Sequence, residues 1–233
     1  SVPTPLIVAI DGPAGAGKST VSKILARRLG YSLVDTGAIY RCVALLARRL
    51  RISATNDEGL SDILNALQIE FQMHEEENHV FLAGEDVSDE IRTPEISMLA
   101  SQISSRPVVR SGLLELQRRL ARHSAHGTIL EGRDIGTVVF PDADVKIFLV
   151  ADAEIRARRR FEELFARGNE RPLDEVRSDQ NRRDKDDAER VSAPLKSADD
   201  AVTVDSSSMP LSDVVFQIEQ LVLKTARDRT VKS

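Results

Sequence analysis

The sequence predicts an α/β fold with a doubly wound parallel sheet, and three observations lead to this prediction. An apolar stretch, residues 6–10, runs directly into a glycine-rich segment that opens a helix. Strand-like apolar segments and amphipathic helical segments then alternate along most of the chain. A nearly continuous apolar run at 145–150 is typical of a parallel strand that is buried on both faces. In such a fold the ligand binds at the carboxyl ends of the strands.

The glycine-rich segment after the first strand fits a loop that binds phosphate. Its two outer glycines permit the close backbone approach that a wrapped phosphate requires, and the following helix adds the positive end of its dipole. Lys18 can reach the β- and γ-phosphates of a nucleotide, and the hydroxyl of Ser19 can coordinate Mg²⁺. The predicted cofactor-binding residues of this loop are Gly12, Pro13, Ala14, Gly15, Ala16, Gly17, Lys18, Ser19 and Thr20.

The remaining strands and helices follow from the period of the apolar residues. Strands of the same sheet are expected at 31–34, 128–134, 145–150 and 201–204. The apolar face of the first helix consists of Val21, Ile24, Leu25 and Leu29, and that of the second consists of Ile39, Val43, Leu46 and Leu50. Two highly charged helices are expected at 153–167 and about 174–190, and an amphipathic helix closes the chain.

A different pattern interrupts this alternation between residues 55 and 110. Apolar and polar residues alternate at 69–73 and 79–83, with a charged turn at 75–78 between them, which predicts an antiparallel hairpin. A further turn at 84–88 suggests a third short strand. Helical periodicity returns after Pro94 and again from about 108 to 122. We therefore expect a small antiparallel subdomain inserted into the main domain.

Composition excludes several classes of function. The chain has 233 residues, of which 41% are hydrophobic and 30% charged, and its net charge is −5. No global positive field therefore attracts nucleic acid or an anionic membrane. A single cysteine, Cys42, fits a reducing compartment, and no apolar run is long enough to span a membrane. We expect a cytoplasmic protein without nucleic-acid or membrane partners, and a monomer, because no helix has a surplus apolar face.

Charged residues near the predicted strand ends are candidates for the site. Arg183, Asp187 and Arg190 stand at i, i+4 and i+7, so that two guanidinium groups could hold phosphate while the carboxylate accepts sugar hydroxyls. The alternative is a solvated helix with ion pairs, since residues 153–190 contain eleven basic and eleven acidic side chains. Asp11 and Asp134 could each orient Mg²⁺ through water or fix nearby arginines.

Five long blocks of this sequence, in order, resemble the bacterial cytidylate kinase family. They are the phosphate loop at 12–19, Asp35-Thr36-Gly37-Ala38-Ile39-Tyr40-Arg41, Gly84-Glu85-Asp86-Val87-Ser88-Asp89-Glu90-Ile91-Arg92, the run from Glu131-Gly132-Arg133-Asp134 to Pro141-Asp142-Ala143, and Arg183-Asp184 with Asp187, Arg190 and Ala193-Pro194-Leu195. The blocks span nearly the whole chain. They are far more specific than the loop alone, which many unrelated nucleotide-binding proteins share.

The resemblance implies transfer of the γ-phosphoryl group of ATP, with Mg²⁺, to CMP and dCMP. It implies one P-loop kinase domain over residues 1–233, a monophosphate-binding subdomain at 55–110 and an arginine-rich lid at 153–192. The implied catalytic residues are Lys18, Arg133, Asp134, Arg183 and Arg190. The implied lid residues over ATP are Arg156 and Arg160. The implied substrate-binding residues are Thr36, Tyr40, Arg41, Ser101, Arg110, Arg133, Asp134, Arg183, Asp187 and Arg190, with Thr36 and Asp187 at the ribose and Ser101 and Arg110 at the cytosine.

Two other functions remain open at this point. The first is a P-loop kinase that acts on UMP or on a non-nucleotide alcohol, which would need a carboxylate base, and Asp134 is the obvious candidate. The second is a slow GTPase-like switch. Such switches use an Asn-Lys-x-Asp signature, to which Asn181-Arg182-Arg183-Asp184 is a poor match.

Overall fold

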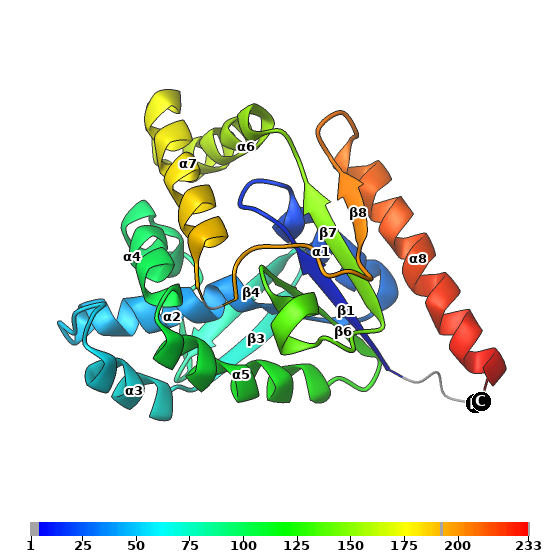
Figure 1. The fold of residues 1–233 in the computed structure, drawn as a ribbon, viewed down its shortest axis with the longest axis horizontal. Helices are drawn as coiled ribbons and strands as arrows, with labels where there is room; N and C mark the ends of the chain where they lie inside the picture. Colours follow the sequence, from blue (N-terminus) through cyan, green and yellow to red (C-terminus); the bar gives the residue numbers. More distant parts are fainter. Residues whose placement is uncertain (1–4, 192, 233) are drawn as a thin grey trace.

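The centre of the molecule is a five-stranded parallel sheet, seen in the computed structural model of residues 5–191 and 193–232. The strand order is β2-β6-β1-β7-β8, and every neighbouring pair is parallel (Figure 1). The strands are β1 (Leu6–Asp11), β2 (Ser32–Asp35), β6 (Gly127–Gly132), β7 (Val145–Val150) and β8 (Val202–Asp205). This arrangement confirms the predicted fold class, because the chain reverses its winding direction on either side of β1.

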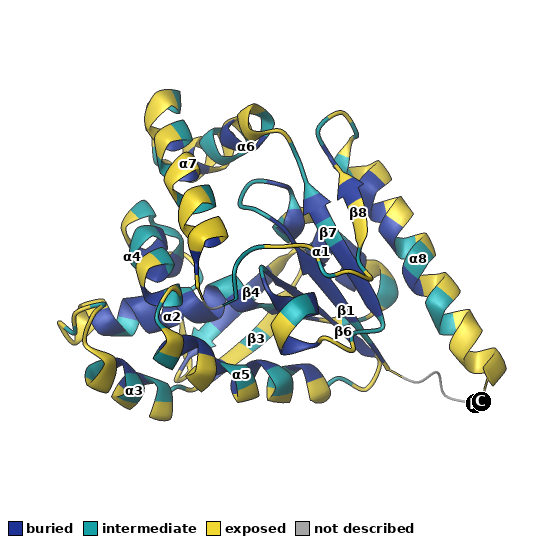
Figure 2. Cartoon of the chain, viewed as in Figure 1, coloured by how far each residue is buried: buried dark blue, intermediate teal, exposed yellow. Residues whose placement is uncertain are grey.

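Helices cover both faces of the sheet because alternate residues of its strands point to opposite sides. Leu6, Val8 and Ile10 of β1 join a core with α1 (Lys18–Leu29) and α8 (Leu211–Lys232). Ala9 faces the other core, which contains α2 (Thr36–Arg49) and α5 (Pro107–Arg122). Figure 2 shows β1, β6 and β7 as almost wholly buried between these two layers, whereas the edge strand β8 is largely exposed. No helix of the described residues is long and apolar enough to cross a membrane.

A small antiparallel sheet lies within the segment where the apolar period changes. It consists of β3 (Ile69–His74), β4 (Glu77–Leu82) and β5 (Glu85–Asp86), flanked by α3 (Asp57–Asn65), α4 (Pro94–Ser104) and a short 3₁₀ helix (Glu90–Arg92). The hairpin turn is tighter than the sequence predicts, because His74 already pairs with Glu77. The buried Asn78 side chain extends the strand contact by donating to the carbonyl of Leu33 on the edge strand β2, at 3.4 Å.

Two features after β6 differ from the sequence prediction. Residues Ile135–Val139 form a π-helix, where no helix was expected. The two charged helices are α6 (Ala153–Ala166) and α7 (Leu173–Glu189). The second difference is that α7 ends one residue before Arg190. The prediction that Arg190 shares a helix face with Arg183 and Asp187 is therefore wrong. The backbone of Arg190 is extended, and its guanidinium folds back onto the carbonyl of Ala193, at 2.7 and 3.0 Å.

Candidate active site

One cavity of about 700 Å³ lies at the carboxyl ends of the parallel strands. Its wall joins the phosphate-binding loop to residues of α2, α4, α5 and the α6–α7 helix pair. Of the residues predicted from the sequence, the wall contains Ala14, Gly15, Gly17, Lys18, Ser19, Thr20, Thr36, Tyr40, Arg41, Ser101, Arg110, Arg133, Asp134, Arg160, Arg183 and Arg190. The predicted residues outside the wall are Gly12, Pro13, Ala16, Arg156 and Asp187.

The phosphate-binding loop has glycines where a side chain would not fit. A Cβ at Gly12 would lie 2.1 Å from the carbonyl oxygen of Leu149, and one at Gly15 would lie 2.7 Å from that of Arg156. Both residues also have positive φ, at 152° and 79°. The ammonium of Lys18 donates to the carbonyl of Pro13, at 2.9 Å, and so crosses its own loop. Burial, followed by the charge of Arg133, lowers the pKa of Lys18.

Arginines gather on the cavity wall without enough acids to balance them. Burial, followed by the charges of Arg160, Arg41 and Arg133, lowers the pKa of Arg183 to about 9. Its Nε is buried and has no hydrogen-bond partner among the described residues. Burial also lowers the pKa of Arg41. Partly buried cations that repel one another favour a bound anion, so this cluster has the electrostatics of a phosphate site. We define the arginine cluster as Arg41, Arg92, Arg133, Arg160 and Arg183.

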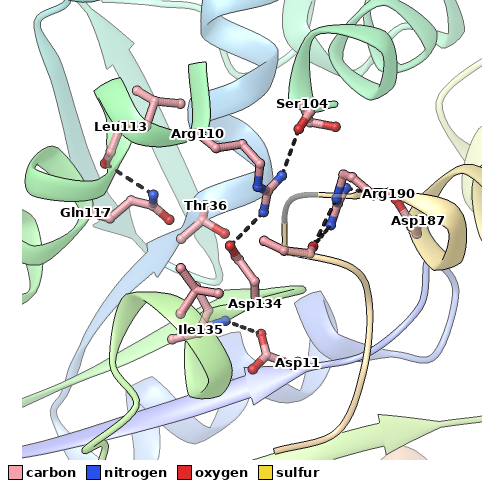
Figure 3. A network of polar contacts seen from close by, with 12 residues as sticks. Asp11, Thr36, Ser104, Arg110, Leu113, Gln117, Asp134, Ile135, Asp187 and Arg190 are labelled. Atoms are coloured by element: carbon pink, nitrogen blue, oxygen red, sulfur yellow. Dashed lines mark hydrogen bonds and ion pairs between the residues drawn. The ribbon is translucent and has the colours of Figure 1, made fainter. Parts of the chain in front are cut away.

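A buried ion pair forms the part of the cavity wall beside α5. The guanidinium of Arg110 donates to the Asp134 carboxylate at 2.6 Å and to the carbonyl of Ser104 at 2.9 Å (Figure 3). It also stacks over the ring of Tyr40, 5.3 Å from the centroid. Burial raises the pKa of Tyr40 to about 12, so this ring stays neutral. Ser101 lies on the same wall, so the structure brings together all four predicted residues of this region.

The two residues implied at the ribose differ in their placement. The hydroxyl of Thr36 donates to the carbonyl of Glu131 at 2.7 Å, and Thr36 lines the cavity. Asp187 is buried beside the cavity and holds two arginines, because its carboxylate accepts from Arg133 and, at 3.3 Å, from Arg190. It therefore fixes the guanidinium groups of two wall residues.

The two predicted lid arginines also differ. Arg160 lines the cavity and forms an ion pair with Glu163 at 3.3 Å. Arg156 is buried outside the wall, where its guanidinium pairs with Asp184 of α7 at 2.9 and 3.1 Å. The same group donates to the carbonyl of Ala14 in the phosphate-binding loop at 3.2 Å. Arg156 thus joins α6 and α7 to the loop.

Among the wall residues that the sequence did not predict are Arg92, Glu131 and Arg159. Arg92 and Glu131 stand inside the sequence blocks that resemble the cytidylate kinase family, and this position is the signal that could have identified them. Burial, followed by the charge of Asp35, raises the pKa of Glu131 to about 8, and its Oε2 has no partner among the described residues. Arg159 gave no signal, since it stands between two other arginines on a charged helix. Its guanidinium donates to the carbonyl of Ala16 at 3.2 Å and to that of Ser206 at 2.8 Å.

Comparison with known proteins decides the family. The family model described as cytidylate kinase matches residues 8–224. The chain belongs to the cytidylate kinase family. A cytidylate kinase from Geobacter sulfurreducens is 54% identical over 95% of this chain and 94% of its own length, and one from Caldicellulosiruptor bescii is 44% identical over 95% and 97%. The resemblance stated from the sequence is therefore confirmed, and with it the assignment of the chain to the ATP-dependent phosphotransferases.

Solved structures resemble this fold only distantly. A gluconokinase from Sinorhizobium meliloti covers 100% of this chain and 98% of its own, with 16% identity and a TM-score of 0.47. A likeness of this strength does not bear on the substrate.

Proposed function

We propose that the chain transfers the γ-phosphoryl group of ATP directly to the phosphate of CMP, and also to that of dCMP. The observation that carries this proposal is that one cavity contains the phosphate-binding loop, the arginine cluster and the Arg110–Asp134 pair. In the proposed assignment the loop holds ATP and the arginine cluster holds the acceptor phosphate and the transferring group. Ser101 and Arg110 read the cytosine, and Thr36 and Asp187 lie toward the ribose.

The chemistry of this acceptor suits the residues of the wall. The phosphate of CMP is already an oxyanion at neutral pH, so transfer requires positioning and charge stabilisation but no strong protein base. The positive charges of Lys18 and Arg183 supply that stabilisation, and neither a histidine nor a cysteine lines the described cavity. An alcohol acceptor would need Asp134 as base, but the Asp134 carboxylate is held by Arg110 at 2.6 Å. This contact favours the nucleotide monophosphate over the alcohol.

The donor set is compatible with Mg²⁺. Ser19 supplies a hydroxyl on the cavity wall beside Lys18, and Glu131 adds a buried carboxyl oxygen that has no partner among the described residues. No group of three or more His, Cys, Asp and Glu in the described chain could hold a metal by itself. This fits an ion that keeps several waters and takes only one or two protein oxygens together with nucleotide phosphates. When bound, Mg²⁺ would neutralise charge on the β- and γ-phosphates, and we propose Ser19 as its protein ligand.

We further propose that residues 153–192 act as a lid and residues 55–110 as the acceptor-binding part of a single domain, 1–233. The lid would exclude water, which competes with CMP for the phosphoryl group. Arg160 of α6 and Arg183 of α7 line the cavity, so closure of these helices would complete the positive site. We also propose a monomer in the cytoplasm, for which the single buried Cys42 is suited; gel filtration would test the monomer.

An ADP-release assay tests the acceptor. The protein is supplied with MgATP and each of CMP, dCMP, UMP, AMP and GMP, beside a control without acceptor. We expect rapid ADP release with CMP and dCMP only. Rapid release with UMP as well would broaden the acceptor to pyrimidine monophosphates. Release that is the same with every monophosphate and without one would contradict the proposal and favour a slow hydrolase.

A further inference from the structure

Asp11 is buried at the carboxyl end of β1, outside the cavity wall, and the residue after it begins the phosphate-binding loop. Both of its carboxylate oxygens are occupied. One accepts from the backbone amide of Ile135 at 2.9 Å and the other from that of Gly136 at 2.8 Å. The carboxylate therefore binds two backbone amides. The sequence had suggested two other roles for it, orienting Mg²⁺ or fixing an arginine.

The two amides belong to the first turn of the π-helix, Ile135–Val139. The first amides of a helix have no partner inside the helix, and an aspartate at the N-cap position commonly accepts from them. Asp134 occupies that position, yet its side chain makes no capping hydrogen bond. Its carboxylate instead accepts from Arg110 on the cavity wall (Figure 3). Asp11, from a different strand, therefore performs the capping that Asp134 would ordinarily perform.

We propose that Asp11 is a positioning residue of the acceptor pocket: it caps the π-helix and thereby leaves the Asp134 carboxylate free to hold Arg110. The proposal rests on the proposed function, because it assigns Arg110 to the acceptor base. Without Asp11, two amides lose their acceptor, and a buried donor without a partner destabilises the fold. The carboxylate of Asp134 is the acceptor adjacent to them in the chain. Its return to the cap would release Arg110.

The side chains of Lys146 and Asp11 both lie beside Gly136 of the cap. A Cβ at Gly136 would lie 3.1 Å from Cδ of Lys146, whereas its distance to Oδ2 of Asp11, 3.4 Å, would be an ordinary van der Waals contact. The charge of Asp134 raises the pKa of Asp11 and that of Lys18 lowers it. Burial raises the pKa of Asp11 to about 6, whereas its two amide bonds lower it, so the carboxylate is ionised at neutral pH.

The test uses Asp11→Asn, whose side chain keeps one acceptor oxygen and turns an NH₂ group toward the second amide. Binding of CMP and of ATP to the intact protein is measured separately by calorimetry. Although Asp11 adjoins the ATP loop, we expect CMP affinity to fall about tenfold, a loss on the scale of one hydrogen bond, while ATP affinity changes less than about twofold. Val215→Ala, in the core under α8, is the matched control. It should lower the melting temperature without changing CMP affinity.

A double-mutant cycle with Asp134→Asn distinguishes positioning from general support of the structure. If Asp11 acts through Asp134, adding Asp11→Asn to the Asp134→Asn variant should lower the CMP affinity of that variant by less than about twofold. Additive losses, or an equal loss of ATP affinity, would overturn the proposal. If Asp11→Asn fails to fold, Asp11→Ser, which keeps one short hydroxyl acceptor at the cap, should weaken CMP binding in the same direction. A wild-type protein that does not bind CMP would refute the proposed function instead.

Discussion

The guanidinium of Arg156 forms a double ion pair with Asp184, at 2.9 and 3.1 Å, and also donates to the carbonyl of Ala14 at 3.2 Å. This one side chain therefore connects α6, α7 and the phosphate-binding loop. The ion pair lies mostly out of solvent, so water and salt screen it weakly. The position of α7, which carries Arg183 into the cavity wall, thus depends on a contact with the loop that is proposed to hold ATP.

Asp184→Asn should loosen α7 and displace Arg183. We expect kcat with CMP to fall about tenfold, because a small misplacement of a stabilising charge is costly in the transition state. The ratio of ATP hydrolysis to phosphoryl transfer should rise at the same time, because a loosened lid admits water. Glu154→Gln is the control, since it breaks the exposed ion pair with Arg177 on the same helix pair. Equal effects of the two substitutions would argue against a special role for the Arg156–Asp184 contact.

Arg183→Ala should separate activity from stability. The side chain is surrounded by cations that lower its pKa to about 9, so its removal relieves repulsion in the protein without nucleotide. We expect the melting temperature to stay the same or rise, while kcat falls about a hundredfold through loss of one stabilising charge. Thermal melting and steady-state kinetics on the same preparation test both parts. Parallel losses of melting temperature and activity would indicate that Arg183 has only a structural ion-pair role.

Lys18→Ala should remove transition-state stabilisation of about 3 kcal/mol, the scale of one oxyanion donor, and so lower kcat about a hundredfold. In the structure the Lys18 ammonium donates to the carbonyl of Pro13. We expect it to exchange this partner for a phosphate oxygen when ATP binds. The neighbouring Lys23 is a matched control, because it lies on the same helix and also on the cavity wall, where it pairs with Glu77. Lys23→Ala should retain most of the activity.

Glu131→Gln should change how stability depends on pH. The pKa of Glu131 is raised to about 8 in the folded protein, above its ordinary value. Its contribution to stability is therefore fully present below the unfolded pKa of about 4.3 and is lost as pH rises through about 8. Gln cannot titrate, so the melting temperature of the variant minus that of the wild type should increase between about pH 5 and about pH 9. A difference that is constant over this range would mean that folding does not raise the pKa of Glu131.

The parts of the fold that the sequence predicts are those governed by local pattern. The period of the apolar residues predicts all five parallel strands, and the alternation at 69–73 predicts the hairpin. The π-helix was not predicted, because a long-range acceptor stabilises it. Its first amides bind Asp11, 124 residues away along the chain, and the carbonyl of Val139 accepts from Arg118. No window of the local sequence contains these partners.

The residues of the site, like the fold, could be predicted only where a local motif identifies them. The glycines and Lys18 follow from the chemistry of a phosphate loop, whereas Ser101 was assigned only through the family resemblance. The partners of the arginines could not be predicted, because a charged helix offers many equivalent pairs. Asp184 pairs with Arg156, and Asp187 pairs with Arg133, because tertiary packing brings these distant segments together, whereas the Asp187–Arg190 pair is local in sequence. Burial also raises the pKa of Glu131, and nothing in the local sequence distinguishes this residue from the other acids.

Transfer of label from ATP carrying a radioactive γ-phosphate tests the central claim most directly, because it distinguishes direct transfer to the monophosphate from hydrolysis. The wild-type protein is incubated with labelled MgATP and CMP, and the products are separated. We expect the label to appear in CDP, with little free phosphate, and Arg183→Ala to reduce this transfer strongly. Label found only in inorganic phosphate, whether or not CMP is present, would contradict it.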